Sequence, residues 1–541
     1  MNLGALGLAP AAVSILIIAA CSGPNDNDTS DGGAESGSEQ TLQLGNPDEP
    51  PDLLPYDSHG GKEPVFAAIL TPLIWVDSAG EWHSELLESW EVSDDGLTVT
   101  LEMNSGLEWT DGTAVTSADV ALTLEHNLDP QVSVRAGSLA GVVGAEEFLS
   151  GETEEIAGLT TPDEHTVVIE LESPSVWLQD MARERIFVVP EHVLGDVPHD
   201  DLNDHEYFSS FPVSNGPYKF VEWESGQHIE LERSDQWSLG EAGFSRLFIK
   251  YLPGDVANAQ LETGELHYYD RVDPSDADRI AEFEHVEIQS TTGVSQSPVW
   301  GLMYNEPLLD ERVRQAMAHA IDRKGICEAA FNGFCTVPET NIPHIAPEWA
   351  LPDSGITVYD YDPERAKELL KQADWNSENE LIFLSWSEPG GPRDRALEIA
   401  QANMADVGIN WTIENVDLPT MNERNEESPE SFHGWEGAGG NFAVDPNFVR
   451  ELTACDKHFP MGANRGHYCN EELDDLWSAG SSETDQEERA RIYKDAFRIL
   501  NEDVPNIWMI IPDNIVAHDA RLDGVNPETR VREIGDWSWE E

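Results

Sequence analysis

The chain has 541 residues, 40% of them hydrophobic, which is enough for two or three domains with real cores. It carries 30 Lys and Arg against 104 Asp and Glu, a formal net charge of −74, which argues against nucleic-acid binding because that requires clustered cations. Such like charges repel at ordinary ionic strength, but in molar salt they are screened over ~3 Å. We therefore expect an acidic, salt-adapted surface and a halophilic source; a salt-tolerant protein whose surface repels partners is the alternative.

Residues 1–21 have the pattern of a lipoprotein signal peptide. An apolar run ends in Ile18-Ala19-Ala20-Cys21, which resembles a lipobox, where cleavage precedes the Cys and the Cys thiol carries diacylglycerol. The acidic, polar residues 22–40 are typical of a flexible tether. We expect a lipid anchor at Cys21, with a transmembrane anchor as the alternative. No Lys or Arg precedes Lys62, so the basic start of a signal peptide is missing, and either the start codon or the export route is unusual.

After the tether, the hydrophobic pattern predicts several short strands and one helix. Strand patterns occupy residues 41–44, 97–101 and 166–171, and a helix pattern occupies 117–128. Residues 218–223 and 228–232 predict a hairpin that turns at Ser225-Gly226, and another strand follows at 246–252.

The second half of the chain has a clearer α/β pattern. Helices are predicted at 310–321, at 364–373 behind an Asp362 N-cap and Pro363, and at 486–501, with a strand after the last at 507–511. Residues 381–386, 393–407 and 409–414 predict a strand, a helix that ends at Gly408, and a second strand. Such a βαβ unit normally has parallel strands and a right-handed crossover.

The four cysteines after Cys21 fall into two close pairs, Cys327 with Cys335 and Cys455 with Cys469. An exported protein meets an oxidising compartment, so we expect each pair to form a disulfide. A zinc site is the alternative, but the spacings are not those of a C-x-x-C motif, and the remaining ligands would have to come from distant segments.

Catalytic signatures are absent from the sequence. It contains no H-E-x-x-H, P-loop, G-x-S-x-G or G-x-G-x-x-G motif, and its 16 His are scattered. We therefore expect no enzyme activity, no cofactor and no metal. Trp300, Trp386 and Trp435 lie at or just after predicted strand ends, where open α/β sheets bind ligands, so each is either a ligand contact or core packing.

Seven segments spread over residues 41–520 carry motifs in a fixed order. They are residues 87–98 (LESWEVSDDGLT), 109–113 (WTDGT), 117–120 (SADV), 214–220 (SNGPYKF), 310–316 (DERVRQA), 361–370 (YDPERAKELL) and 468–474 (YCNEELD). Together they closely resemble the signature of the family 5 extracellular solute-binding proteins, the oligopeptide/dipeptide-binding type. Glu471 stands where that family usually has Pro.

The resemblance implies an α/β, two-lobed periplasmic-binding-protein-like fold of type II, with an extra inserted domain and the ligand in the interlobe cleft. Domain I is expected at residues 41–60, 185–290 and 512–541, domain II at 61–184, and domain III, the second lobe, at 291–511. Crossing strands around Gly293–Asn305 and Pro505–Ile511 are expected to form the hinge about which the lobes close on the ligand.

The resemblance also implies a function. The chain is expected to be the substrate-binding component of an ABC transporter, a monomer anchored by its lipid to the outer face of the cell membrane. It would capture a di- or oligopeptide and pass it to the permease subunits. An oligosaccharide or another solute is the alternative ligand, and a chemosensory receptor module or a secreted hydrolase are alternatives of other classes.

One segment departs from the family pattern, at the place where peptide-binding members have an Asp that pairs with the amino terminus of the peptide. Four residues before Pro446 this chain has Phe442, so either Glu436 or Asp445 replaces that Asp, or the ligand has no free amine. We expect ligand contacts from this altered segment and from nearby strand ends, namely Trp435, Glu436, Gly437, Asn441, Trp386 and Asn305.

Overall fold

The computed structural model describes residues 41–540 except for short gaps, so the predicted signal peptide, Cys21, the tether and Asn441 lie outside the described residues. The gaps are 58–59, 78–80, 137–138, 154, 175–176, 294–296, 298, 344–348, 350, 352–355, 387–389, 438–444 and 461. Residues Gln40–Glu541 form one compact unit. Among the described residues, no helix is both long and apolar enough to cross a membrane.

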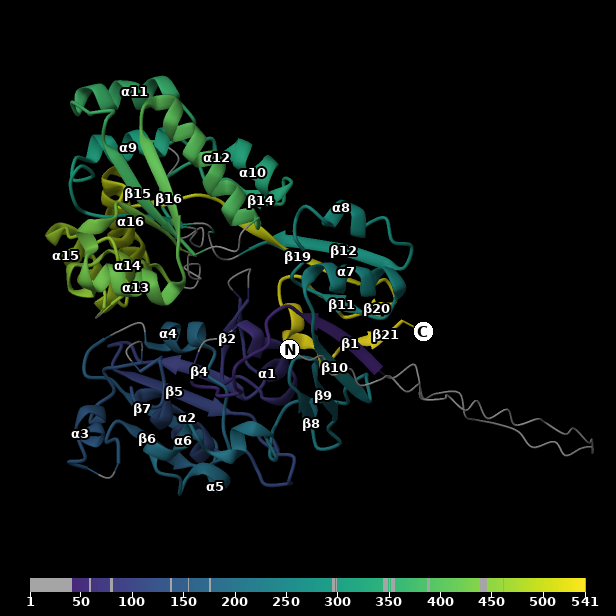
Figure 1. The fold of residues 1–541 in the computed structure, drawn as a ribbon. Helices are drawn as coiled ribbons and strands as arrows, with labels where there is room; N and C mark the ends of the chain where they lie inside the picture. Colours follow the sequence, from purple (N-terminus) through teal and green to yellow (C-terminus); the bar gives the residue numbers. More distant parts are fainter. Residues whose placement is uncertain are drawn as a thin grey trace, which may run out of the picture. The chain divides into compact units, whose positions relative to one another are not determined.

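The largest sheet takes its eight strands from distant parts of the chain (Figure 1). They are β1 (Thr41–Asn46), β8 (Tyr218–Glu224), β9 (His228–Arg233), β10 (Arg246–Tyr251), β11 (Tyr268–Tyr269), β12 (Val286–Thr292), β14 (Cys335–Thr336) and β19 (Ile511–Asp519). The order is β12-β19-β11-β1-β10-β9-β8, and β14 pairs with β19. Because β1 runs parallel to β10 and β11, the carboxyl ends of these three strands lie at one edge of the sheet.

Four strands of this sheet, β1, β8, β9 and β10, form where the sequence predicts them. In β1, Leu42 and Leu44 point into the core, and Ile229 and Leu231 of β9 do the same. The β8–β9 hairpin turns at Gly226, whose φ of +76° favours glycine. The predicted hairpin and the predicted strand at β10 are both confirmed.

A second, antiparallel sheet has four strands in the order β4-β5-β7-β6. Its strands are β4 (Leu87–Val92), β5 (Thr98–Met103), β6 (Leu159–Asp163) and β7 (Thr166–Glu170). Helix α2 (Ser117–Leu128) begins at an N-cap, Thr116, whose capping box with Asp119 fixes its start. We call the eight-stranded and four-stranded sheets with their helices the first lobe.

The second lobe is built on a five-stranded sheet in the order β16-β15-β17-β13-β18. Its strands are β13 (Val299–Leu302), β15 (Glu380–Ser385), β16 (Asn410–Asn415), β17 (Gly434–Gly437) and β18 (Asn506–Trp508). β15 is parallel to both β16 and β17. Helix α12 (Pro392–Val407) joins β15 to β16 and ends at Gly408, whose φ is +89°. This arrangement confirms the predicted βαβ unit.

Three further helices of the second lobe form where the sequence predicts them. They are α9 (Glu311–Ala320), α11 (Pro363–Gln372) and α16 (Gln486–Asp503). An aspartate caps the start of each helix by accepting a backbone N–H with its side chain: Asp310, Asp362 and Asp485. Local sequence therefore fixes these boundaries.

The chain crosses between the two lobes along neighbouring segments. Gly293 N donates to Pro512 O at 3.0 Å, and Ser297 N donates to Ile510 O at 3.0 Å. The single strand predicted at residues 507–511 is wrong, because β18 ends at Trp508 in one sheet and β19 begins at Ile511 in another. The unbroken apolar run from Ile507 to Ile511 gives no sign of this break.

Both cysteine pairs are disulfides in the structure. Cys327 bonds to Cys335 with a Cα–Cα distance of 6.0 Å, and Cys455 bonds to Cys469 with a Cα–Cα distance of 4.6 Å.

The remaining helices and strands lie outside the three large sheets. They are α1 (Glu63–Ile69), β2 (Trp75–Val76), β3 (Trp82–His83), α3 (Ala145–Leu149), α4 (Trp177–Glu184), α5 (Glu191–Leu194), α6 (His199–Leu202), α7 (Gly254–Thr263), α8 (Ala277–Ile280), α10 (Arg323–Phe331), α13 (Leu418–Glu427), α14 (Arg450–Thr453), α15 (Glu471–Ser482), β20 (Leu522–Asp523) and β21 (Ser538–Trp539), with six 3₁₀ turns at Gly60–Lys62, Glu206–Ser209, Pro429–Ser431, Pro446–Val449, Cys455–Lys457 and Arg530–Glu533.

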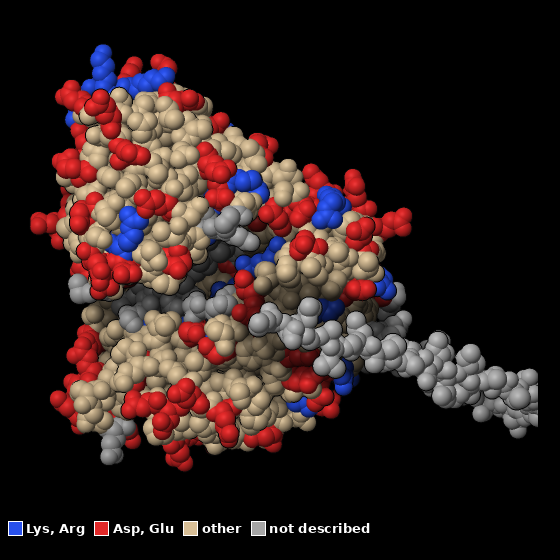
Figure 2. All heavy atoms as spheres, viewed as in Figure 1, with Lys and Arg blue, Asp and Glu red and all other residues tan. Residues whose placement is uncertain are grey.

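Carboxylates predominate among the charged side chains on the visible surface. On the face drawn in Figure 2, Asp and Glu side chains cover far more area than Lys and Arg. With 104 acidic residues and 30 basic ones, most carboxylates have no cation available to pair with. This excess of carboxylates agrees with adaptation to high salt, which stays a prediction.

Candidate functional site

A cavity of about 1050 Å³ is lined by residues of both lobes. Its first-lobe wall consists of the segments that directly follow β1, β10 and β11, together with the start of β19. Its second-lobe wall is the beginning of α12, the helix that follows β15. Open α/β sheets bind ligands beyond the carboxyl ends of parallel strands, so this cavity has the position of a ligand site.

The cavity lining is strongly acidic, but most of its charged side chains already have partners. Among the described residues it contains six Asp and three Arg. Arg530 pairs with Asp270 and with Glu63, and Arg395 of α12 lies 3.5 Å from the first-lobe carboxylate of Asp273. Side chains that compensate one another in this way are poorly suited to receive a charged ligand.

Asp513 differs from these paired residues. It lies near the start of β19, beside the crossing between the lobes, and its side chain is half-buried. Within the described part of the chain, its carboxylate has neither a cation nor a hydrogen-bond donor, and burial alone raises the pKa of Asp513. A ligand that brings a positive charge to this position would remove the cost of burying the carboxylate.

In the second lobe, Glu436 is fully buried in β17 beside the carboxyl end of β15. Ser385 Oγ donates to Glu436 Oε2 at 3.0 Å, and Arg393 Nε donates to Oε1 at 2.5 Å. The Arg393 guanidinium also lies 4.7 Å from the ring centre of Trp386, whose Nε1 donates to the Glu436 backbone oxygen at 2.7 Å. Glu436 is therefore neutralised inside its own lobe and holds Arg393 in place.

Asp445 is also paired within the second lobe. Its carboxylate lies 2.8 Å from Arg489, and the two side chains are 1% and 2% exposed. Asp445 Oδ1 also accepts the N–H of Asn447 at 2.8 Å, which caps the following 3₁₀ turn. Its contacts are therefore those of a structural ion pair.

The family model for bacterial extracellular solute-binding proteins, family 5 middle, matches residues 81–458, which is more than half of the chain. The chain belongs to this family. Its members bind solutes outside the cytoplasm, and the family is not one of enzymes. Nearly all the segments that carry the resemblance in sequence lie within the matched residues.

Relatives of this family 5 protein match it over most of their length. It is 24% identical to the oligopeptide-binding protein AppA of Bacillus subtilis over 471 residues, or 84% of this chain and 82% of AppA. It is 28% identical to a putative ABC transporter peptide-binding protein of Brucella ovis over 458 residues, or 81% of this chain and 80% of the relative.

Two solved structures share the fold. That of Bacillus subtilis AppA in complex with a nonapeptide has a TM-score of 0.76 at 21% identity, and that of the ABC transporter substrate binding protein CtaP from Listeria monocytogenes has a TM-score of 0.80 at 22% identity. Each match covers 93% of this chain and 99% of the other. The expected two-lobed type II fold is confirmed.

The residues that we predicted to contact the ligand have different surroundings in this family 5 protein. Trp435 is 9% exposed and packs against two glycines, since a Cβ on Gly301 or Gly437 would lie 2.2 or 2.3 Å from its ring. Asn305 Nδ2 donates to the Phe432 oxygen at 3.0 Å. The structure brings Trp386 and Glu436 together, but their contact with a ligand, like that of Trp435, Gly437 and Asn305, stays a prediction.

Two candidate residues of the site escaped the sequence analysis. Arg393 could have been found from the sequence, because it is one of only 30 basic residues. It also directly follows Gly390-Gly391-Pro392, where a helix begins after a predicted strand. Asp513 could not, because it is one of 104 acidic residues and its importance depends on which groups surround it in space.

Proposed function

We propose that this family 5 protein is the extracytoplasmic substrate-binding component of an ABC transporter, and that it captures a short peptide and delivers it to the membrane permease. The observation that carries the ligand class is the acidic cavity of about 1050 Å³ between groups of both lobes. Small-molecule sites usually measure ~300–1,000 Å³, so this cavity suits a ligand of a few residues. Two relatives support both the peptide and the transporter: the oligopeptide-binding protein AppA and the putative ABC transporter peptide-binding protein of Brucella ovis.

Within this proposal, Asp513 receives the ammonium group of the peptide. It is the half-buried cavity carboxylate whose pKa burial raises without an offsetting cation. Glu436 and Asp445, our first candidates for this role, already pair with Arg393 and Arg489. A charge-assisted hydrogen bond from an ammonium group to Asp513 is worth ~1.5–3 kcal/mol, enough to select ligands with a free amine.

Two of the three Trp residues that motivated the oligosaccharide alternative are unavailable for stacking on a sugar. Sugar rings stack on exposed aromatic faces, and we expected Trp residues at strand ends to provide them. Trp300 is 0% exposed and Trp435 is 9% exposed, so both rings are packed in the protein. Trp386 is partly exposed, but the Arg393 guanidinium lies 4.7 Å from its ring centre. Sugars remain a useful comparison in the binding experiment.

The proposal includes the attachment of the protein. Cleavage before Cys21 and lipidation of its thiol would anchor a monomer to the outer face of the membrane through the tether of residues 22–40. The variant Cys21→Ser, expressed beside the parent, is expected to move from the membrane fraction to the soluble extracytoplasmic fraction. Retention of Cys21→Ser in the membrane would contradict a lipid anchor and support a spanning one.

The proposal also keeps the domain limits of 41–60, 185–290 and 512–541 for domain I, 61–184 for domain II, and 291–511 for domain III. The distribution of strands supports this division, because the four-stranded sheet lies within residues 87–170 and the five-stranded sheet within 299–508. The short strand β14 is an exception, since it pairs with β19 of the first lobe.

A thermal-shift screen in molar KCl tests the proposal. The full-length protein is heated with di- to pentapeptides, with the same peptides N-acetylated, and with oligosaccharides of similar size. A ligand at 100 times its dissociation constant adds ~2.7 kcal/mol of stability, so a true ligand raises the melting temperature clearly. A shift with free peptides is the expected result, whereas a shift with sugars alone would overturn the peptide assignment.

A further inference from the structure

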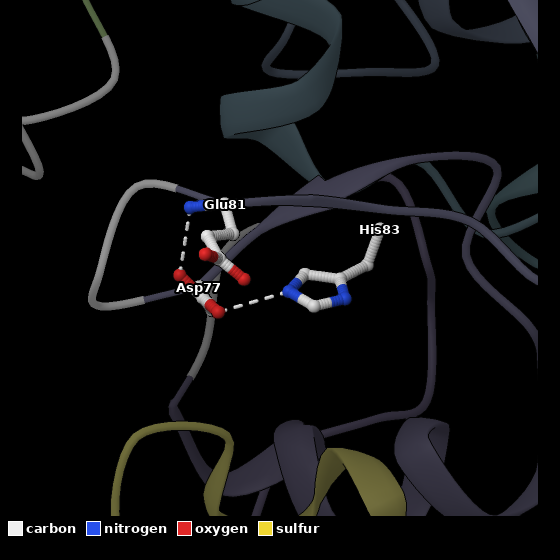
Figure 3. A group of neighbouring side chains, drawn as sticks. All are labelled: Asp77, Glu81 and His83. Carbon is white, nitrogen blue, oxygen red and sulfur yellow. Dashed lines mark hydrogen bonds and ion pairs between the residues drawn. The ribbon is translucent and has the colours of Figure 1, made fainter.

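The β2–β3 hairpin of the first lobe gathers three potential metal ligands. Asp77 directly follows β2, and Glu81 and His83 lie just before and at the end of β3. One ligand atom from each side chain lies within 4.8 Å of the other two. Figure 3 shows the Glu81 carboxylate and the His83 ring turned toward Asp77.

The hairpin backbone and its neighbours fix two of these ligands. Glu81 N donates to Asp77 Oδ1 at 2.9 Å, and His83 Nε2 lies 2.9 Å from Asp77 Oδ2. The His83 ring stacks on Trp75 with a centroid distance of 4.3 Å and an angle of 18° between the planes. Asp77 is only 7% exposed, so these two ligands are held in place before any ion arrives.

The charges around the hairpin also suit a cation. Glu85 is half-buried two residues beyond His83, and the carboxylates of Asp536 and Glu533 lie close enough to interact with it. The neighbouring Arg532 lies over the Trp75 ring at 5.1 Å and pairs with Glu63 at 3.1 Å. Several carboxylates therefore share one small region, and a bound dication would offset their repulsion.

We propose that Asp77, Glu81 and His83 form a binding site for a single divalent transition-metal ion of the Zn²⁺ type. One imidazole nitrogen with two carboxylates is a donor set that suits Zn²⁺ and similar ions, which bind these atoms at ~2.0–2.2 Å. Ligand atoms around a tetrahedral ion at that distance lie roughly 3.4 Å apart, and rotation of the exposed Glu81 side chain closes most of the remaining gap. Water completes the coordination.

A second cluster with the same donor types provides an internal control. Glu222, His228 and Glu230 on the β8–β9 hairpin also bring three ligand atoms within 4.8 Å. Here, however, the Arg246 guanidinium already forms an ion pair with Glu230. A metal ion would have to displace that cation, so this second cluster is not expected to bind metal tightly.

Zn²⁺ titration of the purified full-length protein tests the site. Isothermal titration is performed in molar KCl, which screens weak binding to the many surface carboxylates. The expected result is one saturable Zn²⁺ per chain, with affinity at least tenfold lower in His83→Ala and in Glu81→Gln and unchanged in His228→Ala. Because Glu81 is exposed, Glu81→Gln reports on binding even if His83→Ala folds poorly.

Two results would overturn the proposal. One is the absence of saturable binding by the parent protein. The other is binding that neither Glu81→Gln nor His83→Ala weakens, which would place the ion elsewhere. Co²⁺ provides an independent spectroscopic signature, because its visible ligand-field band should appear on addition to the parent and to His228→Ala and be lost in His83→Ala.

Discussion

Buried and half-buried carboxylates of the two lobes differ in their partners. In the second lobe, Glu436 and Asp445 are each matched by a buried or half-buried arginine, Arg393 and Arg489. In the first-lobe wall, Asp513 is half-buried without such a partner in the described part of the chain. On an acidic surface an unpaired carboxylate is ordinary, but in a cavity it carries a cost that a ligand can relieve. The positions of the few arginines thus distinguish carboxylates with a structural role from the carboxylate that we propose binds the ligand.

The largest expected effect comes from breaking the Asp445–Arg489 pair. The variant Arg489→Met leaves Asp445 buried without its cation, and removing one partner of a buried pair typically costs ~3–5 kcal/mol. Urea unfolding of the parent and the variant measures this loss. The double variant Asp445→Asn/Arg489→Met is expected to recover most of it, and a loss below about 1 kcal/mol in the single variant would show that the pair is not structural.

Removing the Glu436 charge is expected to have a smaller effect on stability. In Glu436→Gln, Arg393 loses its ionic partner but stays 23% exposed and partly hydrated, so the expected cost is ~1–3 kcal/mol. The Glu436→Gln protein should keep the preference of the parent for free over N-acetylated peptides, because Glu436 does not receive the amine. If calorimetry shows that this preference disappears, Glu436 and not Asp513 is the amine partner.

Changing Asp513 should move stability and affinity in opposite directions. Asp513→Asn removes a carboxylate whose ionisation burial disfavours, so the free variant is expected to be more stable than the parent at neutral pH. Loss of the charge-assisted hydrogen bond lowers affinity for free peptides by roughly 10–150-fold, which corresponds to ~1.5–3 kcal/mol. Thermal unfolding and calorimetry measure the two effects. A variant that loses both stability and affinity would indicate a structural role.

The same residue sets a pH dependence. Its pKa is raised above the ordinary 3.8 in the folded protein, so the folded state binds more protons than the unfolded state between the two values. The contribution of Asp513 to stability therefore rises as pH falls through the raised pKa, while affinity for an ammonium group falls over that range. Asp513→Asn should lack both trends, and unchanged pH profiles in the variant would contradict this assignment.

The smallest effect is expected at Asp48. This aspartate lines the same cavity but is exposed, so water already solvates its charge. Asp48→Asn is expected to change stability by less than about 0.5 kcal/mol and to leave peptide affinity within about twofold. A loss as large as that of Asp513→Asn would mean that overall cavity charge, and not one position, attracts the ligand.

The sequence predicted those parts of the fold whose signals are local. The βαβ unit from β15 to β16, the Asp-capped helices and the hairpin at Gly226 each depend on neighbouring residues, and all form as expected. The break between β18 and β19 was missed because the five residues from Ile507 to Ile511 are all apolar, although β18 ends at Trp508 in the second lobe and β19 begins at Ile511 in the first.

The site was less predictable than the fold because its chemistry depends on long-range contacts. Glu436 and Asp445 became candidates from a family pattern, but their arginine partners come from α12 and α16, 43 and 44 residues away along the chain. Asp77, Glu81 and His83 were passed over because acidic residues are frequent everywhere. In such a chain, only the spatial arrangement of cations and histidines distinguishes one carboxylate from another.

A double-mutant cycle measures whether Asp513 binds the amine of a peptide. One peptide found in the screen and its N-acetylated form are each titrated against the parent protein and Asp513→Asn in molar KCl. Acetylation is expected to weaken binding to the parent by ~1.5–3 kcal/mol and to have little effect on the variant. Equal losses on acetylation in both proteins would show that Asp513 and the amine do not interact, and would contradict the assignment.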